Sequence, residues 1–239
     1  MIFGAILAAG IGSRMNISDM PKQFLPLGEK PIIIHTIEKF LLCERFDKIY
    51  VGVSPKWMLH TKDLLRKYSI DENRVIVTLG GDDRNGTIIS IINKIEEDFG
   101  ESKEHIIVTH DSVRPFVTLR IIEDNIDAAI NNKACDTVVS AIDTIVVSKD
   151  ADTISDIPNR RFMYQGQTPQ SFNMSMLKEL YNELRDDEKA ILTDACKICV
   201  VRNVPVKLVD GEISNIKITT VSDYKMAQAM INQTMDDLI

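Results

Sequence analysis

Two glycines and two cationic side chains stand close together near the start of the chain, directly after a short apolar run. Gly10 and Gly12 follow the run, Arg14 comes two residues later, and Lys22 lies in a Pro-Lys-Gln-Phe segment. Because glycine lets backbone N–H groups approach a phosphate closely, and Arg and Lys neutralise its charge, this spacing predicts a loop that binds a triphosphate. The Gly-x-Gly alone would be typical of an ordinary turn with solvated charges. The segment matches neither the GxGxxG dinucleotide fingerprint nor the GxxxxGK[ST] phosphate loop.

A second glycine-rich segment begins at Gly80-Gly81 and continues through Arg84 to Thr87. The backbone donors and acceptors of such a turn can hydrogen-bond the edge of a pyrimidine, and glycine lets the base lie against the main chain. The alternative is a turn that only starts a helix, and the segment by itself favours the two interpretations equally.

Two further segments carry charge at places where apolar residues dominate. In His110–Phe116, Asp111 and Arg114 follow a β-branched run, and the arginine either positions the carboxylate, binds a phosphate or forms a structural salt bridge. Lys217 lies between two isoleucines in Asn215–Thr219. A lysine in such a run either extends its stem to solvent or points at a ligand.

The elements that must position these residues alternate along the first half of the chain. Apolar runs predict strands at residues 3–8, 48–53, 75–79 and 106–109, and helical spacing predicts helices at 31–42, 57–68, 87–99 and 118–131. This order is typical of an α/β fold of the Rossmann-like class, a mainly parallel twisted sheet with helices on both faces. The polar clusters after Ala8, Leu79 and Thr109 fall at carboxyl ends of strands, where ligands bind in such sheets.

The alternation breaks in the second half. A strand is predicted at 137–141, and two β-like runs at 144–148 and 153–157 flank a polar turn, which indicates a hairpin projecting from the sheet. Helices are predicted at 174–184, 194–201 and 222–233, and short strands at 206–209 and 216–218. With no repeat or linker in the chain, we expect one domain over residues 1–239 that carries a β-arm at about residues 142–165.

Composition excludes several classes of function. The formal net charge of −7 disfavours a globally basic surface for nucleic acid. No stretch approaches the roughly 18 apolar residues of a membrane span, and the apolar N-terminus lacks the basic region of a signal peptide, so we expect a cytoplasmic protein without a membrane partner. Cys196 and Cys199 form a CxxC pair with no second pair of ligands nearby, which favours two core-facing thiols over a zinc site.

The string LAAGIGSRM…PKQF resembles the nucleotide-binding signature of the sugar-phosphate nucleotidyltransferases. Its form is similar to the CTP-dependent branch that acts on methylerythritol phosphate or ribitol 5-phosphate, and further blocks of that branch follow in the same order over nearly the whole chain. The resemblance implies that CTP binds to Leu7, Ala8, Ala9, Gly10, Gly12, Gly80, Gly81, Arg84, Thr87 and Asp111. It also implies that Asp111 binds Mg²⁺, a cation that needs few protein oxygens when phosphates supply others.

The same resemblance implies catalytic and acceptor-binding roles. Arg14 and Lys22 would neutralise the triphosphate, and Lys217 would contact the α-phosphate under attack. Thr144 and Arg160, on the arm, would hold the acceptor's phosphate in a partner subunit, so a homodimer is implied. Residues assigned to the acceptor are Arg114, Thr144, Arg160, Thr168 and Thr193.

The function expected from this resemblance is transfer of a cytidylyl group from CTP to a polyol phosphate. HDSVRPF, MYQGQTPQSFN, ILTDACKI and NIKITT look closer to the ribitol 5-phosphate type, which supplies teichoic acid or capsule precursors. Methylerythritol 4-phosphate, of isoprenoid synthesis, is the alternative acceptor. A non-catalytic nucleotide-binding protein is the alternative of another class, and the full set of charged residues disfavours it. A dehydrogenase would need an acidic ribose-binding residue after residues 48–53, where Val53-Ser54-Pro55 supplies none.

Overall fold

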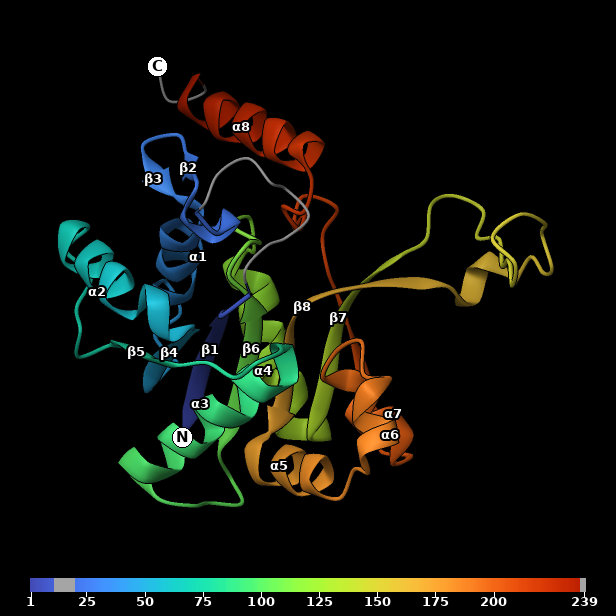
Figure 1. Ribbon diagram of the computed structural model, residues 1–239, viewed down its shortest axis with the longest axis horizontal. Coiled ribbons are helices and arrows are strands. Elements are labelled where there is room, and N and C mark those ends of the chain that lie inside the picture. Colours follow the sequence, from blue (N-terminus) through green and yellow to red (C-terminus); the bar gives the residue numbers. More distant parts are fainter. Residues whose placement is uncertain (11–19, 237–239) are drawn as a thin grey trace.

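The computed structural model describes residues 1–10 and 20–236, with side chains as far as residue 232. Gly12 and Arg14 therefore lie outside the described residues. Within the described part, a seven-stranded sheet with the order β5-β4-β1-β6-β8-β7-β9 forms the centre of the molecule (Figure 1). Its strands are β1 (Ile2–Ala8), β4 (Lys48–Val53), β5 (Val75–Leu79), β6 (Ile106–Asp111), β7 (Ala134–Ser140), β8 (Tyr164–Asn173) and β9 (Lys207–Asp210).

The first half of the sheet is parallel, as the apolar runs predict. β1 pairs in parallel with both β4 and β6, and β4 pairs in parallel with β5. The expected α/β fold with a mainly parallel sheet is confirmed. The carboxyl ends of β1, β5 and β6 therefore meet at one edge, and the chain segments that carry Gly10, Gly81 and Asp111 leave the sheet there.

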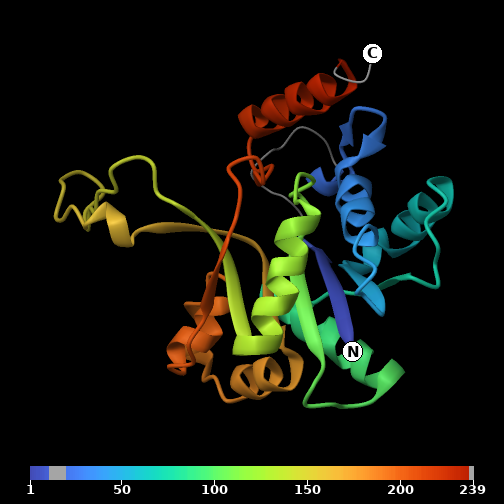
Figure 2. The same cartoon turned by 180° about the vertical axis from the view of Figure 1, so that it is seen from behind.

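Helices cover both faces of the sheet and build two separate cores. On one face α1 (Ile32–Leu41), α2 (Met58–Lys67) and α4 (Leu119–Asn132) pack against alternate residues of β1, β4 and β6, and Figure 2 shows α4 on that side. On the other face lie α3 (Arg84–Phe99), α5 (Met174–Asn182) and α7 (Cys196–Val201), with the short α6 (Asp186–Ala190) beside them. Cys196 and Cys199 are buried in this second core, as core-facing thiols should be.

The strand β8 is absent from the elements that the sequence predicts. It lies antiparallel between β6 and β7, while β9 is parallel to β7. Its residues Gln167–Gln170 are buried although most of them are polar, and Nε2 of Gln167, the Thr168 hydroxyl and Nε2 of Gln170 are hydrogen-bonded in the interior. Because β8 contains a glycine, a proline and several glutamines, it lacks the apolar periodicity that would predict a strand.

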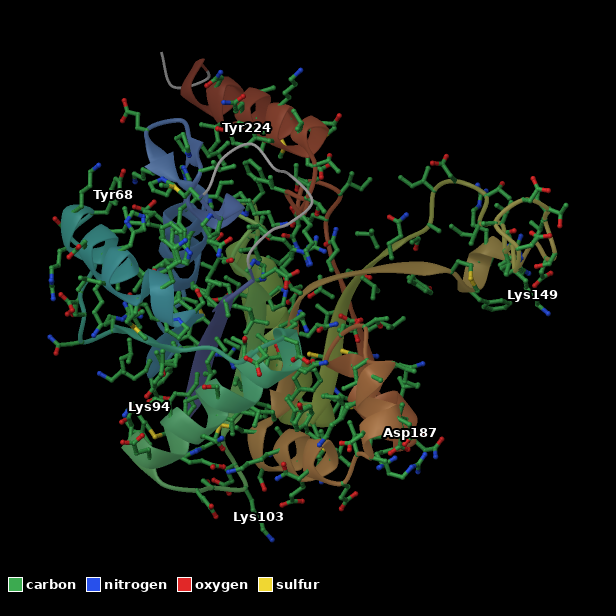
Figure 3. All side chains as sticks on the ribbon, viewed as in Figure 1. Tyr68, Lys94, Lys103, Lys149, Asp187 and Tyr224 are labelled. Carbon is green, nitrogen blue, oxygen red and sulfur yellow. The ribbon has the colours of Figure 1, made fainter. Side chains whose placement is uncertain are left out.

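The segment between β7 and β8 projects away from the sheet (Figure 1). Figure 3 shows Lys149 near its far end. The two predicted strands of a hairpin are reduced to one β-bridge, between Val147 and Asp156. The Asp150 carboxylate accepts hydrogen bonds from the N–H groups of Asp152 and Thr153, at 3.0 and 2.9 Å, so the backbone turns there and does not extend a ladder. A 3₁₀ turn, η3 (Arg160–Phe162), precedes β8.

The C-terminal residues return to the edge where the ligand-binding segments meet. The predicted strand at 216–218 does not form, although the Ile218 N–H donates to the Val113 carbonyl at 3.0 Å. The helix α8 (Val221–Asp236) packs over the hairpin of β2 (Pro26–Leu27) and β3 (Lys30–Pro31), as Figures 1 and 3 show near Tyr224. Leu27, Ile218 and Ala227 are buried together there. Among the described residues, no helix has the length and apolar character that crossing a membrane requires.

Candidate active site

A pocket of about 660 Å³ opens at the carboxyl ends of β1 and β6, beside the N-terminus of α3. Most sequence-predicted nucleotide-binding residues line it, together with several that were not predicted. The predicted lining residues are Leu7, Ala8, Ala9, Gly10, Lys22, Gly81, Arg84, Thr87, Asp111, Thr193 and Lys217. The lining residues that sequence reasoning missed are Gln23, Asp82, Asp83, Ser112 and Val113.

Asp111 is the charged centre of this pocket. Its Oδ1 lies 3.2 Å from Nε of Arg84, and its Oδ2 lies 2.8 Å from Nζ of Lys217. Nε of Arg114 is 3.7 Å from the same Oδ2. One buried carboxylate therefore faces three cations, of which Arg84 and Lys217 come from distant parts of the chain, and the local surplus of positive charge suits a polyanionic ligand.

Burial and the three neighbouring cations together determine the charge state of Asp111. Burial by itself raises the pKa of the carboxyl, but Arg84, Lys217 and Arg114 outweigh burial and hold the pKa well below its ordinary value of 3.8. Asp111 is therefore ionised at neutral pH, as an ion pair or a metal ligand requires.

Hydrogen bonds of Thr168 and His110 hold the backbone of Asp111 in place. The Thr168 hydroxyl accepts from the Asp111 N–H at 3.2 Å and lies 2.9 Å from Nδ1 of His110, whose Nε2 lies 3.1 Å from the Arg114 carbonyl. Burial lowers the pKa of His110 to about 4, so the ring is neutral and Nε2 is the nitrogen that donates. Thr168, expected at the acceptor site, is buried and does not line the pocket, because its hydroxyl is engaged in this network.

The segment that carries Lys217 is anchored by its neighbour Asn215. Nδ2 of Asn215 donates to the Thr168 carbonyl at 2.9 Å, and the Asn215 carbonyl accepts from Nη1 of Arg114 at 2.7 Å. Arg114 is itself buried and lies behind the pocket lining. Arg114 thus contacts both Asp111 and the segment that carries Lys217.

The glycine-rich turn before α3 is rigid and tightly packed. The N-cap residue Asp83 accepts from the Gly86 N–H at 2.6 Å, and the Thr87 hydroxyl accepts from the Gly81 N–H at 3.1 Å and donates to the Asp83 carbonyl at 2.8 Å. A Cβ on Gly81 would stand 2.4 Å from the carbonyl carbon of Gly86, so only glycine fits. Gly80 lies just behind, outside the pocket lining, and its N–H donates to the Val53 carbonyl at 2.7 Å.

Gln23 fixes the loop that follows β1. Its side chain is buried, and its Nε2 donates to the carbonyls of Ala8 and Gly10 at 2.8 and 3.0 Å. The adjacent Lys22 lies in η1 (Lys22–Phe24) and is thereby held at the pocket. In the sequence, the uncharged amide of Gln23 stands between Lys22 and two apolar residues, and this pattern could have indicated that Gln23 fixes the loop.

Thr144 and Arg160 are not brought to this pocket within one chain. Both are exposed on the projecting segment, where Nη1 of Arg160 donates to the Ile142 carbonyl at 2.5 Å. The two residues expected at the acceptor's phosphate thus do not line the Asp111 pocket of their own chain, and Figure 1 shows the segment between β7 and β8 projecting away from the sheet.

The chemistry that the pocket can perform is transfer between polyanions. Lys22, Arg84 and Lys217 line it, and its described lining contains neither a histidine nor a cysteine that could act as a nucleophile or base. Groups of three or more His, Cys, Asp or Glu able to hold a metal are absent from the described residues. An ionised carboxylate such as Asp111 suits a hard divalent cation whose other ligands are phosphate oxygens and water.

Comparisons with known proteins agree with this architecture. The family model described as "IspD: 2-C-methyl-D-erythritol 4-phosphate cytidylyltransferase" matches residues 2–233. The 4-diphosphocytidyl-2C-methyl-D-erythritol synthase of Anaerococcus prevotii is 27% identical, with 97% of this chain and 96% of that chain covered and a TM-score of 0.79. The Francisella tularensis 2-C-methyl-D-erythritol 4-phosphate cytidylyltransferase is 25% identical over 95% of this chain and 98% of that chain, with a TM-score of 0.78.

The corresponding Thermus thermophilus enzyme is 22% identical over 96% of this chain and 98% of its own, with a TM-score of 0.72, and shares the fold. The family model matches nearly the full length of the chain, and cations surround the Asp111 carboxylate at the carboxyl edge of the sheet. This chain therefore belongs to the IspD family of cytidylyltransferases.

Proposed function

We propose that this enzyme transfers the cytidylyl group of CTP to the phosphate of a polyol phosphate and releases pyrophosphate. The observation that carries the proposal is the Asp111 carboxylate, with Lys217 at 2.8 Å and Arg84 at 3.2 Å, at the floor of a pocket that Lys22 also lines. The family membership supports the nucleotide, and the cation content of the pocket supports a reaction between two phosphates.

The reaction itself needs no general base. A phosphate monoester has a second pKa of about 6, so the acceptor is largely a dianion at neutral pH. One of its oxygens forms a bond to the α-phosphorus of CTP, and the bond from that phosphorus to the bridging oxygen of the β-phosphate breaks. The electron pair leaves with pyrophosphate. The task of the protein is to bring two polyanions together and stabilise the charge of the in-line transition state.

The charged residues divide this task. Lys217 reaches the pocket from the C-terminal segment and is assigned to the α-phosphate. Lys22 is assigned to the β- and γ-phosphates, together with Arg14, which the described residues do not include. Arg114 and Thr168 hold Asp111 in place from behind the lining. The glycine-rich turn at Gly81 offers its backbone to the cytosine base.

A divalent cation, Mg²⁺ in the expected case, fits this pocket with one protein ligand. Asp111 is ionised and lines the pocket, and both of its oxygens already accept from cations. Asp111 would hold the metal jointly with the phosphates of CTP, and Lys217 would then be released toward the α-phosphate. When bound, such a cation neutralises triphosphate charge and favours departure of pyrophosphate.

A homodimer completes the site in this proposal. Thr144 and Arg160 are exposed on the projecting segment and do not line the pocket of their own chain. The same segment exposes Ile142, Ile154 and Phe162, the last at 73%, which is typical of a surface that a second copy covers. Arg160 would hold the acceptor's phosphate in the partner's pocket through its planar, two-pronged donor group.

Two acceptors are candidates, and different observations favour each. Methylerythritol 4-phosphate has the support of the family description and of the solved structures named above, all of which carry that activity in their titles. Ribitol 5-phosphate has the support of the blocks around Asp111, Thr168, Thr193 and Lys217. At 27% identity or below, side chains that select the acceptor are free to differ between this chain and those enzymes.

One assay tests both the chemistry and the acceptor. Pyrophosphate release from CTP and Mg²⁺ is followed with methylerythritol 4-phosphate and ribitol 5-phosphate in parallel, with ATP in place of CTP as the nucleotide control. Release with either acceptor, and only with CTP, supports the proposed function and identifies isoprenoid or cell-wall precursor synthesis. Silence with both acceptors would overturn it.

A further inference from the structure

The segment that brings Lys217 to the pocket has no regular secondary structure of its own. Residues 211–220, all of which the structure describes, lie between β9 and α8 and form neither a helix nor a strand. Asn215 fixes this segment before Lys217, and after it the Ile218 N–H donates to the Val113 carbonyl at 3.0 Å. Because no ladder of backbone hydrogen bonds runs through the segment, individual contacts must hold the backbone of Lys217 in place.

Asp223, in the first turn of α8, ties the chain after Lys217 to that helix. Its Oδ2 accepts from the Thr219 N–H at 2.9 Å and from the Thr220 N–H at 2.7 Å. The Thr219 hydroxyl also donates to the Lys217 carbonyl at 3.3 Å. A single carboxylate oxygen therefore closes the turn that begins two residues after Lys217.

Part of this arrangement is an ordinary helix cap. The Thr220 hydroxyl accepts from the Asp223 N–H at 3.2 Å, while the Asp223 carboxylate accepts from the Thr220 N–H, and this reciprocal pair is a capping box. The bond from the Thr219 N–H is additional, because Thr219 precedes the cap and lies on the side of Lys217. Asp223 therefore joins α8 to the segment that carries the lysine, besides capping the helix.

The helix to which Asp223 ties this segment is itself fixed beside the pocket. The Tyr224 hydroxyl donates to the Pro26 carbonyl, and Ala227 is buried against the β2–β3 hairpin (Figures 1 and 3). That hairpin directly follows η1, whose Lys22 lines the pocket. The helix α8 is thus anchored next to the segment that carries one pocket lysine and, through Asp223, holds the segment that carries the other.

The Asp223 side chain is a charged acceptor. Burial by itself raises the pKa of its carboxyl, but the hydrogen bonds from Thr220 and Thr219, together with the positive charge of Lys22, outweigh burial and hold the pKa below its ordinary value of 3.8. The carboxylate is therefore ionised at neutral pH. Hydrogen bonds to an ionised acceptor are roughly twice as strong as those between neutral groups, so this contact can hold a turn that no strand supports.

We propose that Asp223 is a positioning residue, which holds the backbone of Lys217 so that its ammonium group lies at Asp111 and, in the reaction, at the α-phosphate. This inference rests on the proposed function and adds to it the source of the lysine's alignment. Nζ of Lys217 lies 2.8 Å from Oδ2 of Asp111 at the end of a flexible side chain that is 37% exposed, so the backbone must be fixed for the ammonium group to stay aligned. Displacing such a group by about 1 Å can cost on the order of a hundredfold in rate.

Steady-state pyrophosphate release from CTP and Mg²⁺, with the acceptor on which the wild type is active, tests this role. Asp223→Ala removes both hydrogen bonds, and we expect kcat to fall about tenfold while the KM of CTP changes less than about twofold, since alignment in the transition state is lost and ground-state binding is kept. Asp223→Asn should restore most of the rate, because one amide oxygen can accept from the same two N–H groups.

Two further variants separate the alignment of Lys217 from the stability of α8. Thr220→Ala removes the hydroxyl of the capping box but keeps both N–H groups that bind Asp223, so it should lower the melting temperature and leave kcat within about twofold of the wild type. In the Lys217→Ala background, Asp223→Ala should cause no further loss of kcat, because Asp223 acts only through that lysine.

The outcomes separate the two proposals. With an active wild type, a normal kcat for Asp223→Ala, or an equal loss for Thr220→Ala, overturns the positioning role and leaves Asp223 as a helix cap. A further loss in the Lys217→Ala background, or an Asp223→Asn variant as slow as Asp223→Ala, also overturns it, because Asp223 would then act apart from Lys217 or through its charge alone. A wild type that releases no pyrophosphate with any acceptor overturns the proposed function, and the role of Asp223 with it.

Discussion

Replacing Asp136 by Asn should stabilise the protein above about pH 7 and leave its stability little changed near pH 4. Burial raises the pKa of Asp136 to about 6 from an ordinary value of 3.8; Asp194 adds to this rise, and Gln170 and Arg84 oppose it. The folded protein therefore binds this proton more tightly than the unfolded chain does. The stability that the neutral carboxyl contributes is present below pH 3.8 and is lost as the pH rises through about 6.

The size of this stability change follows from the difference between the pKa of Asp136 in the folded protein and its ordinary value. About two pKa units at about 1.36 kcal/mol each give on the order of 3 kcal/mol once Asp136 is ionised. Asn carries no charge and still accepts from Gln170, so the variant avoids this cost. A gain of that size would be a large share of the ~5–15 kcal/mol that stabilises an ordinary domain.

Urea unfolding of the ligand-free protein, followed by circular dichroism at several pH values, measures the effect. The free-energy difference between Asp136→Asn and wild type should grow between about pH 4 and pH 7 and then level off. Asp127→Asn, whose side chain is 63% exposed, should show no such growth. A difference for Asp136→Asn that is the same at all pH values would refute the argument from burial.

Three further changes test the site. Lys217→Ala should lower kcat about a hundredfold or more in the pyrophosphate assay, because it removes a cation from the transition state, and near-normal turnover would contradict that role. Thr168→Val should cost about 1–3 kcal/mol in urea unfolding, since the Asp111 N–H and His110 lose their shared partner, and Thr168→Ser should restore most of it. Gly81→Ala should weaken CTP binding in calorimetry, because its Cβ would clash with Gly86, and an unchanged affinity would show that the turn can relax.

The parallel half of the fold could be predicted because its signal is local. β1, β4 and β6 are buried on both faces, and the partly buried edge strand β5 is also apolar, so each is a continuous apolar run followed by a helical pattern. β8 gave no such signal, since Thr168, Gln170 and Ser171 are buried through hydrogen bonds that long-range partners supply. The segment between β7 and β8 was predicted as a hairpin, but its two predicted strands are reduced to one bridge between Val147 and Asp156.

The site was predictable where one residue type stands out against its neighbours. Asp111 and Lys217 interrupt apolar runs, and the structure brings them to 2.8 Å from each other. Gln23 carried only a weak signal and Asp136 none, because their hydrogen-bond partners are distant in sequence. Thr168 was predicted as a site residue, but its hydrogen bond with the Asp111 N–H was not predicted, because that bond depends on β8 lying beside β6.

The path of the chain through the site has a consequence for how the protein is made. Lys22 emerges from the ribosome early, whereas Lys217 comes only with the segment that precedes α8, which also packs on the β2–β3 hairpin beside η1. Closing such long loops carries an entropic cost that no local contact offsets. During synthesis the parallel strands β1, β4, β5 and β6 can pair while the pocket still lacks Lys217, so a growing chain does not offer CTP the finished pocket during the early steps of folding.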